Sequence, residues 1–185
     1  YVVLDVSFQL RKADRSQPIA YADLAAGLGV EQGERVPLAD ARAGVLAQRA
    51  KRGMVLEAGD HDTWSCGSFF TNPIVTREQM DSIVARAEER LGADGPVPPQ
   101  FPAGAAHPDM LKTSAAWLID KGGFGKGYNL PGPAALSTKH TLALTNRGTA
   151  TAADVAALAR VVVDGVEEAF GVRLVPEPVW VGLTL

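Results

Sequence analysis

The chain has 185 residues, 46% of them hydrophobic, which is enough to form one substantial core or two modest ones. Its 18 basic and 21 acidic residues give a net charge of -3, so the sequence lacks the positive excess with which proteins bind nucleic acid. Its apolar runs are far shorter than the roughly 20 residues of a membrane-spanning helix, so we expect a cytoplasmic protein without a membrane partner.

The first ten residues alternate as in a half-buried strand. Four apolar residues are each separated by one polar residue: Leu4, Val6, Phe8 and Leu10. Such a strand normally pairs with a neighbour, and the segment starts directly at Tyr1, which is not an initiator methionine. We therefore expect a strand over Tyr1–Leu10 and further chain upstream of it.

Two helices and a second strand are expected next. The region 19–24 leads into a short helix, and Pro37 precedes a longer one that reaches about Arg52. The first lobe is expected to end near Gly53. The apolar pairs within 69–75 predict a strand there.

The best-defined helix signal follows this strand. Thr76 and Gln79 have the spacing of a capping box. Apolar residues then recur at helical spacing: Met80, Ile83, Val84, Ala87 and Leu91. Gly92 is expected to end the helix.

The stretch from Asp94 to Pro108 contains five prolines and several glycines, too many fixed dihedral angles for regular structure. We expect a long surface loop. Loops of this length in compact domains often act as lids or binding loops, and the alternative is a disordered connector.

Three more elements complete the expected fold. A helix is predicted over Ser114–Lys121 and a strand over Lys139–Asn146. Thr151 and Asp154 begin a last helix, and one of its faces carries an apolar stripe: Val155, Leu158, Val162, Val166 and Phe170. Strands that alternate with helices predict a mixed α/β (α+β) fold with a mixed sheet.

The glycine-rich run Gly123–Gly127 could be taken for a phosphate-binding loop. A P-loop, however, has Ser or Thr where Gly127 stands and glycine where Asp120 stands, and this run follows a helix instead of a strand. We expect a helix-ending turn, and a phosphotransferase function remains a minor alternative.

Metal binding and thiol chemistry have weak signals. Asp60, His61 and Asp62 are consecutive residues, which rarely converge on one ion, so a solvated turn is expected and no metal is predicted. Cys66 is the single cysteine, which excludes an internal disulfide, and no His and Asp are placed to activate it as a nucleophile.

The run Gly67–Pro73 (Gly-Ser-Phe-Phe-Thr-Asn-Pro) resembles the Gly-Ser-Phe-Phe-Lys-Asn-Pro motif of the MurB-type UDP-N-acetylenolpyruvoylglucosamine reductases, with Thr71 where lysine is common. Three further stretches resemble the family in the right order: Lys112–Asp120, Ser137–Gly148 and Pro176–Val179. The resemblance covers most of the chain from Tyr21 onward.

The resemblance implies a flavoenzyme of peptidoglycan synthesis. Such enzymes bind FAD, take reducing equivalents from NADPH and reduce UDP-N-acetylglucosamine enolpyruvate to UDP-N-acetylmuramate. Residues 1–52 resemble the tail of the FAD-binding module, 53–171 the substrate-binding domain, and 172–185 a strand that returns to the flavin side. We expect the N-terminal FAD-binding module of the same protein to be the partner of this chain.

The same resemblance assigns two catalytic residues. Ser68 matches the proton donor that quenches the enolate formed when hydride adds to the β-carbon. Its placement matters more than its ground-state acidity, since the carbanion-like carbon is far more basic. Glu177, held between Pro176 and Pro178, matches a glutamate that stabilises the enol form if burial raises its pKa. Without the resemblance, Ser68 would be a turn hydroxyl and Glu177 a surface residue.

The resemblance also implies substrate contacts. Tyr21, Arg52 and Asn72 match residues that bind the diphosphate, with Lys51 as an alternative to Arg52. Lys112 and His140 match substrate-site positions, although a structural role fits either of them. Phe101 stands near the lid tyrosine of one family branch and keeps an aromatic face without the hydroxyl. A UDP-sugar-binding module without redox activity is the second functional hypothesis.

Overall fold

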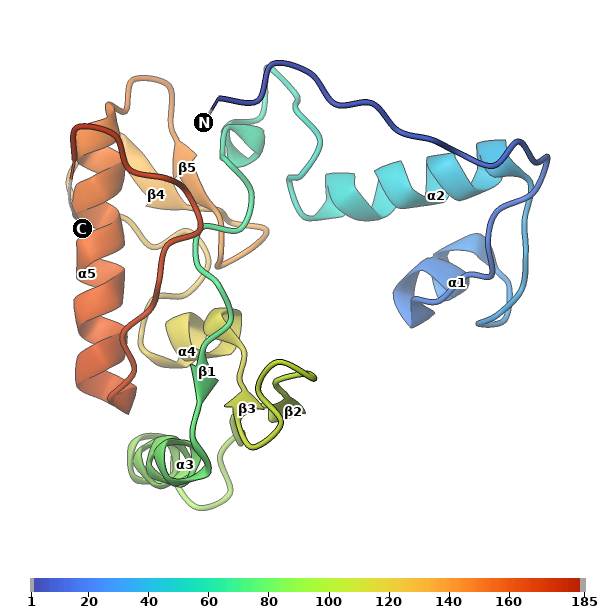
Figure 1. Ribbon diagram of the computed structural model, residues 1–185. Coiled ribbons are helices and arrows are strands. Elements are labelled where there is room, and N and C mark those ends of the chain that lie inside the picture. The colour runs from blue at the N-terminus through green and yellow to red at the C-terminus, as the bar shows by residue number, and fades with distance from the viewer. Residues whose placement is uncertain (1, 184–185) are drawn as a thin grey trace. The chain divides into compact units, whose positions relative to one another are not determined.

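The computed structural model describes residues 2–183 and divides the chain into two compact units, Tyr1–Lys51 and Arg52–Leu185 (Figure 1). The first unit is helical and small, whereas the second contains both sheets and the larger core. None of the helices among residues 2–183 is long and apolar enough to cross a membrane.

The first unit contains the two predicted helices, α1 (Ala22–Leu28) and α2 (Leu38–Lys51), which pack on each other. Gly29, in a left-handed conformation, ends α1. Among the described residues of this unit, the buried core is small and consists of three residues: Ile19, Ala25 and Val36.

The strand predicted over Tyr1–Leu10 does not form in the described part of that range. Residues 2–10 have no regular secondary structure and are all exposed, with Leu4 at 91% (Figure 1). The prediction is wrong there because an alternating pattern becomes a strand only by pairing, and none of the described segments pairs with this one. Tyr1 itself lies outside the described residues.

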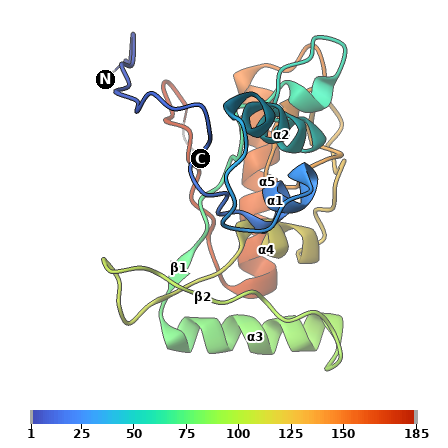
Figure 2. The same cartoon turned by 90° about the vertical axis from the view of Figure 1, so that its right-hand side faces the viewer.

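The core of the second unit forms around α5 (Ala152–Phe170). Its predicted stripe faces inward, because Leu158, Val162, Val166 and Phe170 are buried and Val155 is half-buried. Two further helices, α3 (Arg77–Leu91) and α4 (Ala115–Lys121), pack against α5, and α3 runs across its direction (Figure 2).

The predicted helix starts are confirmed at side-chain level. Thr76 and Gln79 form a capping box at α3, and Thr151 and Asp154 form another at α5. Ser114 caps α4 by accepting a hydrogen bond from Trp117 N. These caps satisfy backbone N–H groups that have no partner within the helix.

The first sheet corrects two predictions. β1 (Ile74–Val75) is the only strand within the predicted range 69–75, and β2 (Phe101–Pro102) lies in the stretch predicted to be a loop. Both pair with β3 (Leu111–Lys112) in the antiparallel order β1-β3-β2. Because β2 is an edge strand, its proline needs no hydrogen-bonding N–H on the open side.

The second sheet joins β4 (Ala134–Leu136) to β5 (Leu144–Asn146) in antiparallel register. The sequence pattern did not predict β4, and the strand predicted from Lys139 begins only at Leu144. Ser137 explains the late start, because its buried hydroxyl accepts hydrogen bonds from the N–H groups of residues 139 and 140 and holds them in a turn. Within residues 2–183, the fold is mixed α/β with small sheets and five α-helices, as predicted in outline. The predicted mixed sheet is wrong there, because every strand pair in the two sheets is antiparallel.

Candidate functional site

Two segments far apart in the sequence run side by side and carry the predicted catalytic residues. Phe70 and Pro176 form an antiparallel bridge, and Glu177 N donates a hydrogen bond to Phe69 O at 2.8 Å. Ser68 directly precedes Phe69. The backbone therefore places Ser68 and Glu177 on neighbouring segments.

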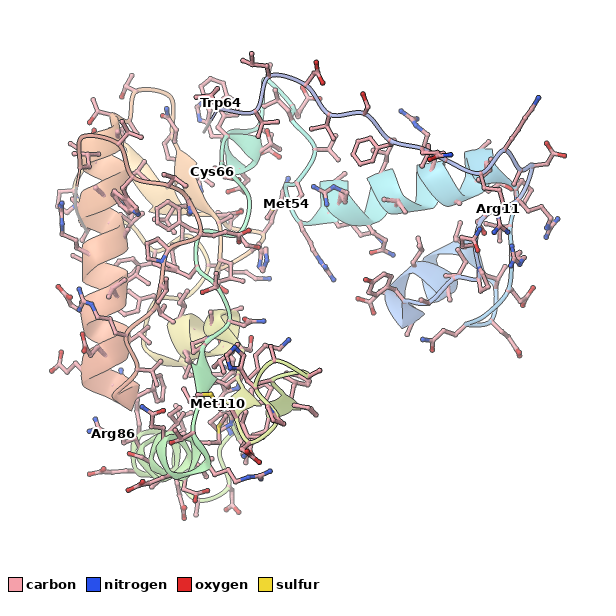
Figure 3. The ribbon with its side chains drawn as sticks, in the orientation of Figure 1. Arg11, Met54, Trp64, Cys66, Arg86 and Met110 are labelled. Atoms are coloured by element: carbon pink, nitrogen blue, oxygen red, sulfur yellow. The ribbon has the colours of Figure 1, made fainter. Side chains whose placement is uncertain are left out.

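The aromatic pair after Ser68 anchors its segment in the core. Phe69 and Phe70 are 3% and 2% exposed, and their rings meet edge to face at 5.1 Å. The ring of Trp180, from the opposite segment, packs on Phe69 at 6.1 Å. Ser68 is half-buried, so its hydroxyl lies where the surface meets the core. Trp64 and Cys66, labelled in Figure 3, mark the chain that leads to it.

Glu177 is exposed, whereas the role predicted for it depends on burial. The cause is the two-residue period of an extended segment. Val172 and Leu174 are buried, and Val175, Glu177 and Val179 are exposed. The described residues thus place Glu177 on the open face of this segment.

A hollow of about 400 Å³ lies next to Phe69 and Trp180. Its lining is apolar and consists of Phe69, Ala152, Val155, Ala156, Pro178, Val179, Trp180, Val181 and Leu183. FAD carries a diphosphate that needs cations or N–H donors, and this lining offers no charged group. The Trp180 indole N–H is buried without a hydrogen-bond partner. This hollow does not fit a whole flavin dinucleotide.

Asn72 connects the Ser68 segment to α4. Its side-chain oxygen accepts a hydrogen bond from Ala115 N at 3.0 Å, which satisfies an N–H at the start of that helix. Asn72 also lines a hollow of about 420 Å³ together with Gln79 and Arg173. Asn72, which is predicted to contact the substrate, thus also makes a hydrogen bond that stabilises the fold.

The first sheet brings two predicted substrate residues together. Lys112 is paired with Phe101 on one side and with Ile74 on the other, so the three side chains lie in one row on the same face. Phe101 is 49% exposed and Ile74 41% exposed. An aromatic face, an aliphatic side chain and a cation are therefore presented to solvent in one line.

Arg52 and His140 lie within electrostatic reach of each other. Burial lowers the pKa of His140 below its usual value of 6.5, and the positive charges of Arg52 and Lys126 lower it further. Arg52 and His140 were both predicted from the sequence as site residues. Lys126 was considered only within the glycine turn.

The prediction that Asp62 lies in a solvated turn is wrong. The side chain is buried, with 5% of the residue exposed. Its carboxylate accepts hydrogen bonds from the backbone N–H (2.9 Å) and hydroxyl of Thr138 and from Arg147 at 2.8 Å. Burial acts to raise the pKa of Asp62, but these hydrogen bonds outweigh it, so the pKa lies below its usual value. No cluster of three potential metal ligands was found among residues 2–183.

The run Gly123–Gly127 is a turn after α4, as predicted. Phe124 N bonds to Ile119 O at 3.0 Å, and Gly127 N bonds to Ser137 O at 3.2 Å. Gly127 has a φ of 78°, which favours glycine. The turn thereby brings Lys126 next to the turn that carries His140.

Tyr21 belongs to the Tyr1–Lys51 unit. It precedes α1 at the N-cap position without making a side-chain cap, and it is 77% exposed. Its aromatic ring and hydroxyl are thus open to solvent within that unit.

Residues 59–181 match the family model described as "UDP-N-acetylenolpyruvoylglucosamine reductase, C-terminal domain". The chain is 61% identical to proteins of that reductase name from Streptomyces avermitilis and Streptomyces coelicolor, and 52% identical to one from Mycobacterium tuberculosis. Each alignment covers 100% of this chain and 50%, 47% and 48% of the relative, respectively. The chain thus spans about half the length of the curated relatives it matches.

Proposed function

Because the chain belongs to the UDP-N-acetylenolpyruvoylglucosamine reductase family, we propose that it supplies the substrate-binding part of an oxidoreductase of peptidoglycan synthesis. The match over residues 59–181 carries the proposal. The pairing that sets Glu177 beside the Ser68 segment supports it.

The proposed reaction reduces the enolpyruvyl C=C bond of UDP-N-acetylglucosamine enolpyruvate, giving UDP-N-acetylmuramate. FAD, reduced by NADPH, supplies the hydride in this scheme. The hollow beside Phe69 does not accommodate the diphosphate of FAD, so we assign the flavin to an N-terminal module of the same protein, with residues 1–52 as its tail. The steps below concern only the residues of this chain.

Ser68 is the proposed proton donor. Hydride addition to the β-carbon of the enolpyruvyl group leaves negative charge on the α-carbon and its carboxylate. The Ser68 hydroxyl transfers its proton to that carbon, and a half-buried hydroxyl next to anchored rings has the fixed placement that this step needs. The resulting alkoxide regains a proton from solvent.

Glu177 is proposed to stabilise the enol form, which requires that it be covered. Val179 and Val181 nearby are 90% and 88% exposed, and apolar residues exposed in this way are typical of a surface that another part covers. We infer that the flavin module covers it and thereby buries Glu177.

The substrate is proposed to bind through cationic side chains, one amide and two aromatic rings. Arg52, Asn72 and Tyr21 are assigned to the diphosphate, and His140 lies within electrostatic reach of Arg52. Phe101 would cover the nucleotide from the edge strand, with Lys112 beside it. The amide nitrogen of Asn72 is the group assigned to the phosphate, since its oxygen binds α4.

A UDP-sugar-binding module without redox activity is the competing function. The presence of both Ser68 and Glu177 favours the reductase, because binding alone requires neither residue. The two functions differ in what the flavin-loaded protein does with NADPH.

Binding and turnover measurements test this proposal. The 185-residue chain should bind UDP-N-acetylglucosamine weakly in calorimetry and should purify without flavin. The flavin-loaded enzyme that contains it should oxidise NADPH only when UDP-N-acetylglucosamine enolpyruvate is added. A flavin spectrum from the chain alone would contradict the assignment of FAD to another module. UDP-sugar binding without substrate-dependent NADPH oxidation would establish the binding-module alternative.

A further inference from the structure

The segment that carries Ser68 is held against the chain of β5 at two points. Ser65 and Thr145 form an antiparallel bridge, and Thr145 is fully buried. Phe69 N then donates a hydrogen bond to Leu142 O at 2.8 Å. The backbone is therefore fixed before Ser68, at Ser65, and again directly after it, at Phe69.

These two pairings are out of register with each other by one residue. Continued from the Ser65–Thr145 pair, a regular antiparallel ladder would place Leu142 opposite Ser68. Leu142 O instead accepts its hydrogen bond from Phe69 N, so the Ser68 segment contains one residue more than its partner. An extra residue of this kind is a β-bulge, and bulges next to active sites commonly redirect a side chain.

Gly67 supplies the backbone conformation of this bulge. Its φ of 85° lies in the left-handed region that favours glycine. Its N–H donates to the hydroxyl oxygen of Ser65 at 3.3 Å, which gives this N–H a partner within its own segment. A Cβ at Gly67 would meet no atom within 4 Å. The glycine is therefore required by its dihedral angles and not by packing.

The Ser68 hydroxyl is left uncommitted by this arrangement. The hydroxyls of Ser65 and Ser137 accept hydrogen bonds from backbone N–H groups, and that of Ser114 caps a helix. Among residues 2–183, by contrast, the half-buried Ser68 hydroxyl has no hydrogen-bond partner. Its direction is thus set by the backbone of the bulge and not by a neighbouring side chain.

We propose that Ser65 and Gly67 are positioning residues for Ser68, because the bulge that they form aims the Ser68 hydroxyl at the α-carbon of the enolpyruvyl group. This inference rests on the proposed function. Neither residue gives up a proton or touches the substrate. Both act through the backbone conformation ahead of Ser68. Misplacing a reacting group by about 1 Å can lower a rate by about 10²-fold, so a relaxed bulge should slow the proton transfer.

Stopped-flow spectroscopy of the flavin-loaded enzyme tests this by separating its two half-reactions. Gly67→Ala should slow reoxidation of the flavin by UDP-N-acetylglucosamine enolpyruvate about 10²-fold, and Ser65→Ala should slow it about tenfold. Reduction of the flavin by NADPH needs no proton from Ser68 and should keep its wild-type rate. The solvent deuterium isotope effect on reoxidation should rise in both variants, because proton transfer limits that step more strongly.

A conservative variant separates the hydrogen bond from the serine itself. Ser65→Thr keeps an oxygen acceptor for Gly67 N and should restore most of the reoxidation rate. In all of these variants the KM for the UDP-sugar substrate should stay within about twofold of wild type, because only the transition state for proton transfer is affected.

The Gly67 amide reports the state of the bulge without any reaction. In the 185-residue chain, Ser65→Ala should speed deuterium exchange of this amide, measured by NMR, because its hydrogen bond is lost. Amides in the middle of α5 should keep their wild-type protection.

Two matched variants control for general damage. Gly92→Ala changes a glycine with a φ of 88° at the end of α3, where a Cβ would also meet no atom within 4 Å. Ser16→Ala removes a hydroxyl that accepts a hydrogen bond from Val36 N at 3.1 Å in the other unit. Both variants should reoxidise the flavin at the wild-type rate.

The outcomes distinguish this inference from the proposed function. Wild-type reoxidation in both Ser65→Ala and Gly67→Ala, together with slow reoxidation in Ser68→Ala, overturns the positioning role and leaves the proposed function intact. An equal loss in the NADPH half-reaction or in the two control variants makes the effect general damage and also overturns it. If Gly67→Ala does not fold, Ser65→Ala decides alone. Wild-type reoxidation in Ser68→Ala overturns the proposed proton donor itself, and the inference with it.

Discussion

The Ser68 hydroxyl precedes two buried aromatic rings, so its removal should leave the segment in place. In the flavin-loaded enzyme we expect Ser68→Ala to lower turnover by a factor of about 10² to 10⁴, the usual contribution of a general acid. The affinity for the UDP-sugar should change little, because binding does not need the proton. NADPH oxidation and calorimetry measure the two quantities.

Ser82→Ala is the control for this change, because Ser82 is an exposed serine on α3 away from the proposed chemistry. It should keep full turnover. A Ser68→Ala enzyme with wild-type turnover would show that another group supplies the proton.

Protonation of a single residue, His140, should make the stability of the fold depend on pH. Its folded-state pKa lies below 6.5, so the unfolded chain takes up the proton first as the pH falls. Stability should therefore decrease below about pH 6.5 by at most about 1.4 kcal/mol per pH unit, until the folded state is also protonated. Urea unfolding between pH 7.5 and 5 measures this slope.

His140→Gln should have a smaller slope over that range, and His107→Gln, at an exposed histidine, should keep the wild-type slope. If His140→Gln and wild type lose stability in parallel, the depressed pKa of His140 is not the cause.

At the scale of elements, α5 contains a glycine, Gly165, at a position where the packed ring of Phe124 leaves no room for a side chain. Gly165 lies inside the helix, where alanine is normally favoured by about 0.5–1 kcal/mol. A Cβ there would lie 2.3 Å from the ring of Phe124, which is 8% exposed and cannot easily move away. Gly165→Ala should therefore destabilise by about 1–3 kcal/mol despite the helix preference.

Gly27→Ala in α1 is the matched control. A Cβ there would meet only the end of the flexible Gln48 side chain, so that variant should be neutral or slightly more stable. Urea unfolding compares the two variants. A stabilising Gly165→Ala would mean that Phe124 does not pack on α5 as described.

At the scale of the whole molecule, the two units differ in the size of their cores. Among the described residues, the core of the Tyr1–Lys51 unit consists of three buried apolar residues, whereas the core of the Arg52–Leu185 unit includes residues of both sheets and three helices. We expect backbone amides in α2 to exchange with deuterium sooner than those in the middle of α5, because fewer apolar contacts oppose local opening. Hydrogen exchange followed by mass spectrometry measures this.

A substitution in the core of the larger unit tests whether the two units open independently. Leu158→Ala in α5 should destabilise the larger unit by about 2–5 kcal/mol and speed exchange in α5 while leaving α2 unaffected. Leu56→Ala, at a leucine that is 78% exposed, should change neither. Equal protection of α2 and α5 in the wild-type chain would show that the two units open together.

Local features of the sequence determined much of the second unit. The capping boxes of α3 and α5, the stripe of α5 and the helix-ending turn after α4 depend on residues within a few positions of one another, so their spacing is visible in the sequence. The family was also recognisable from short motifs, above all Gly67–Pro73, and its model matches residues 59–181.

Pairing between distant segments was decided only by the tertiary structure. The segment 2–10 alternates like a strand but has no partner among the described residues, and β2 forms in a proline-rich stretch because β3 pairs with it. For the same reason, the burial of Asp62 and the exposure of Glu177 could not be read from their neighbours in sequence. A strand or a buried charge is stabilised by groups far along the chain, and only folding brings those groups into contact.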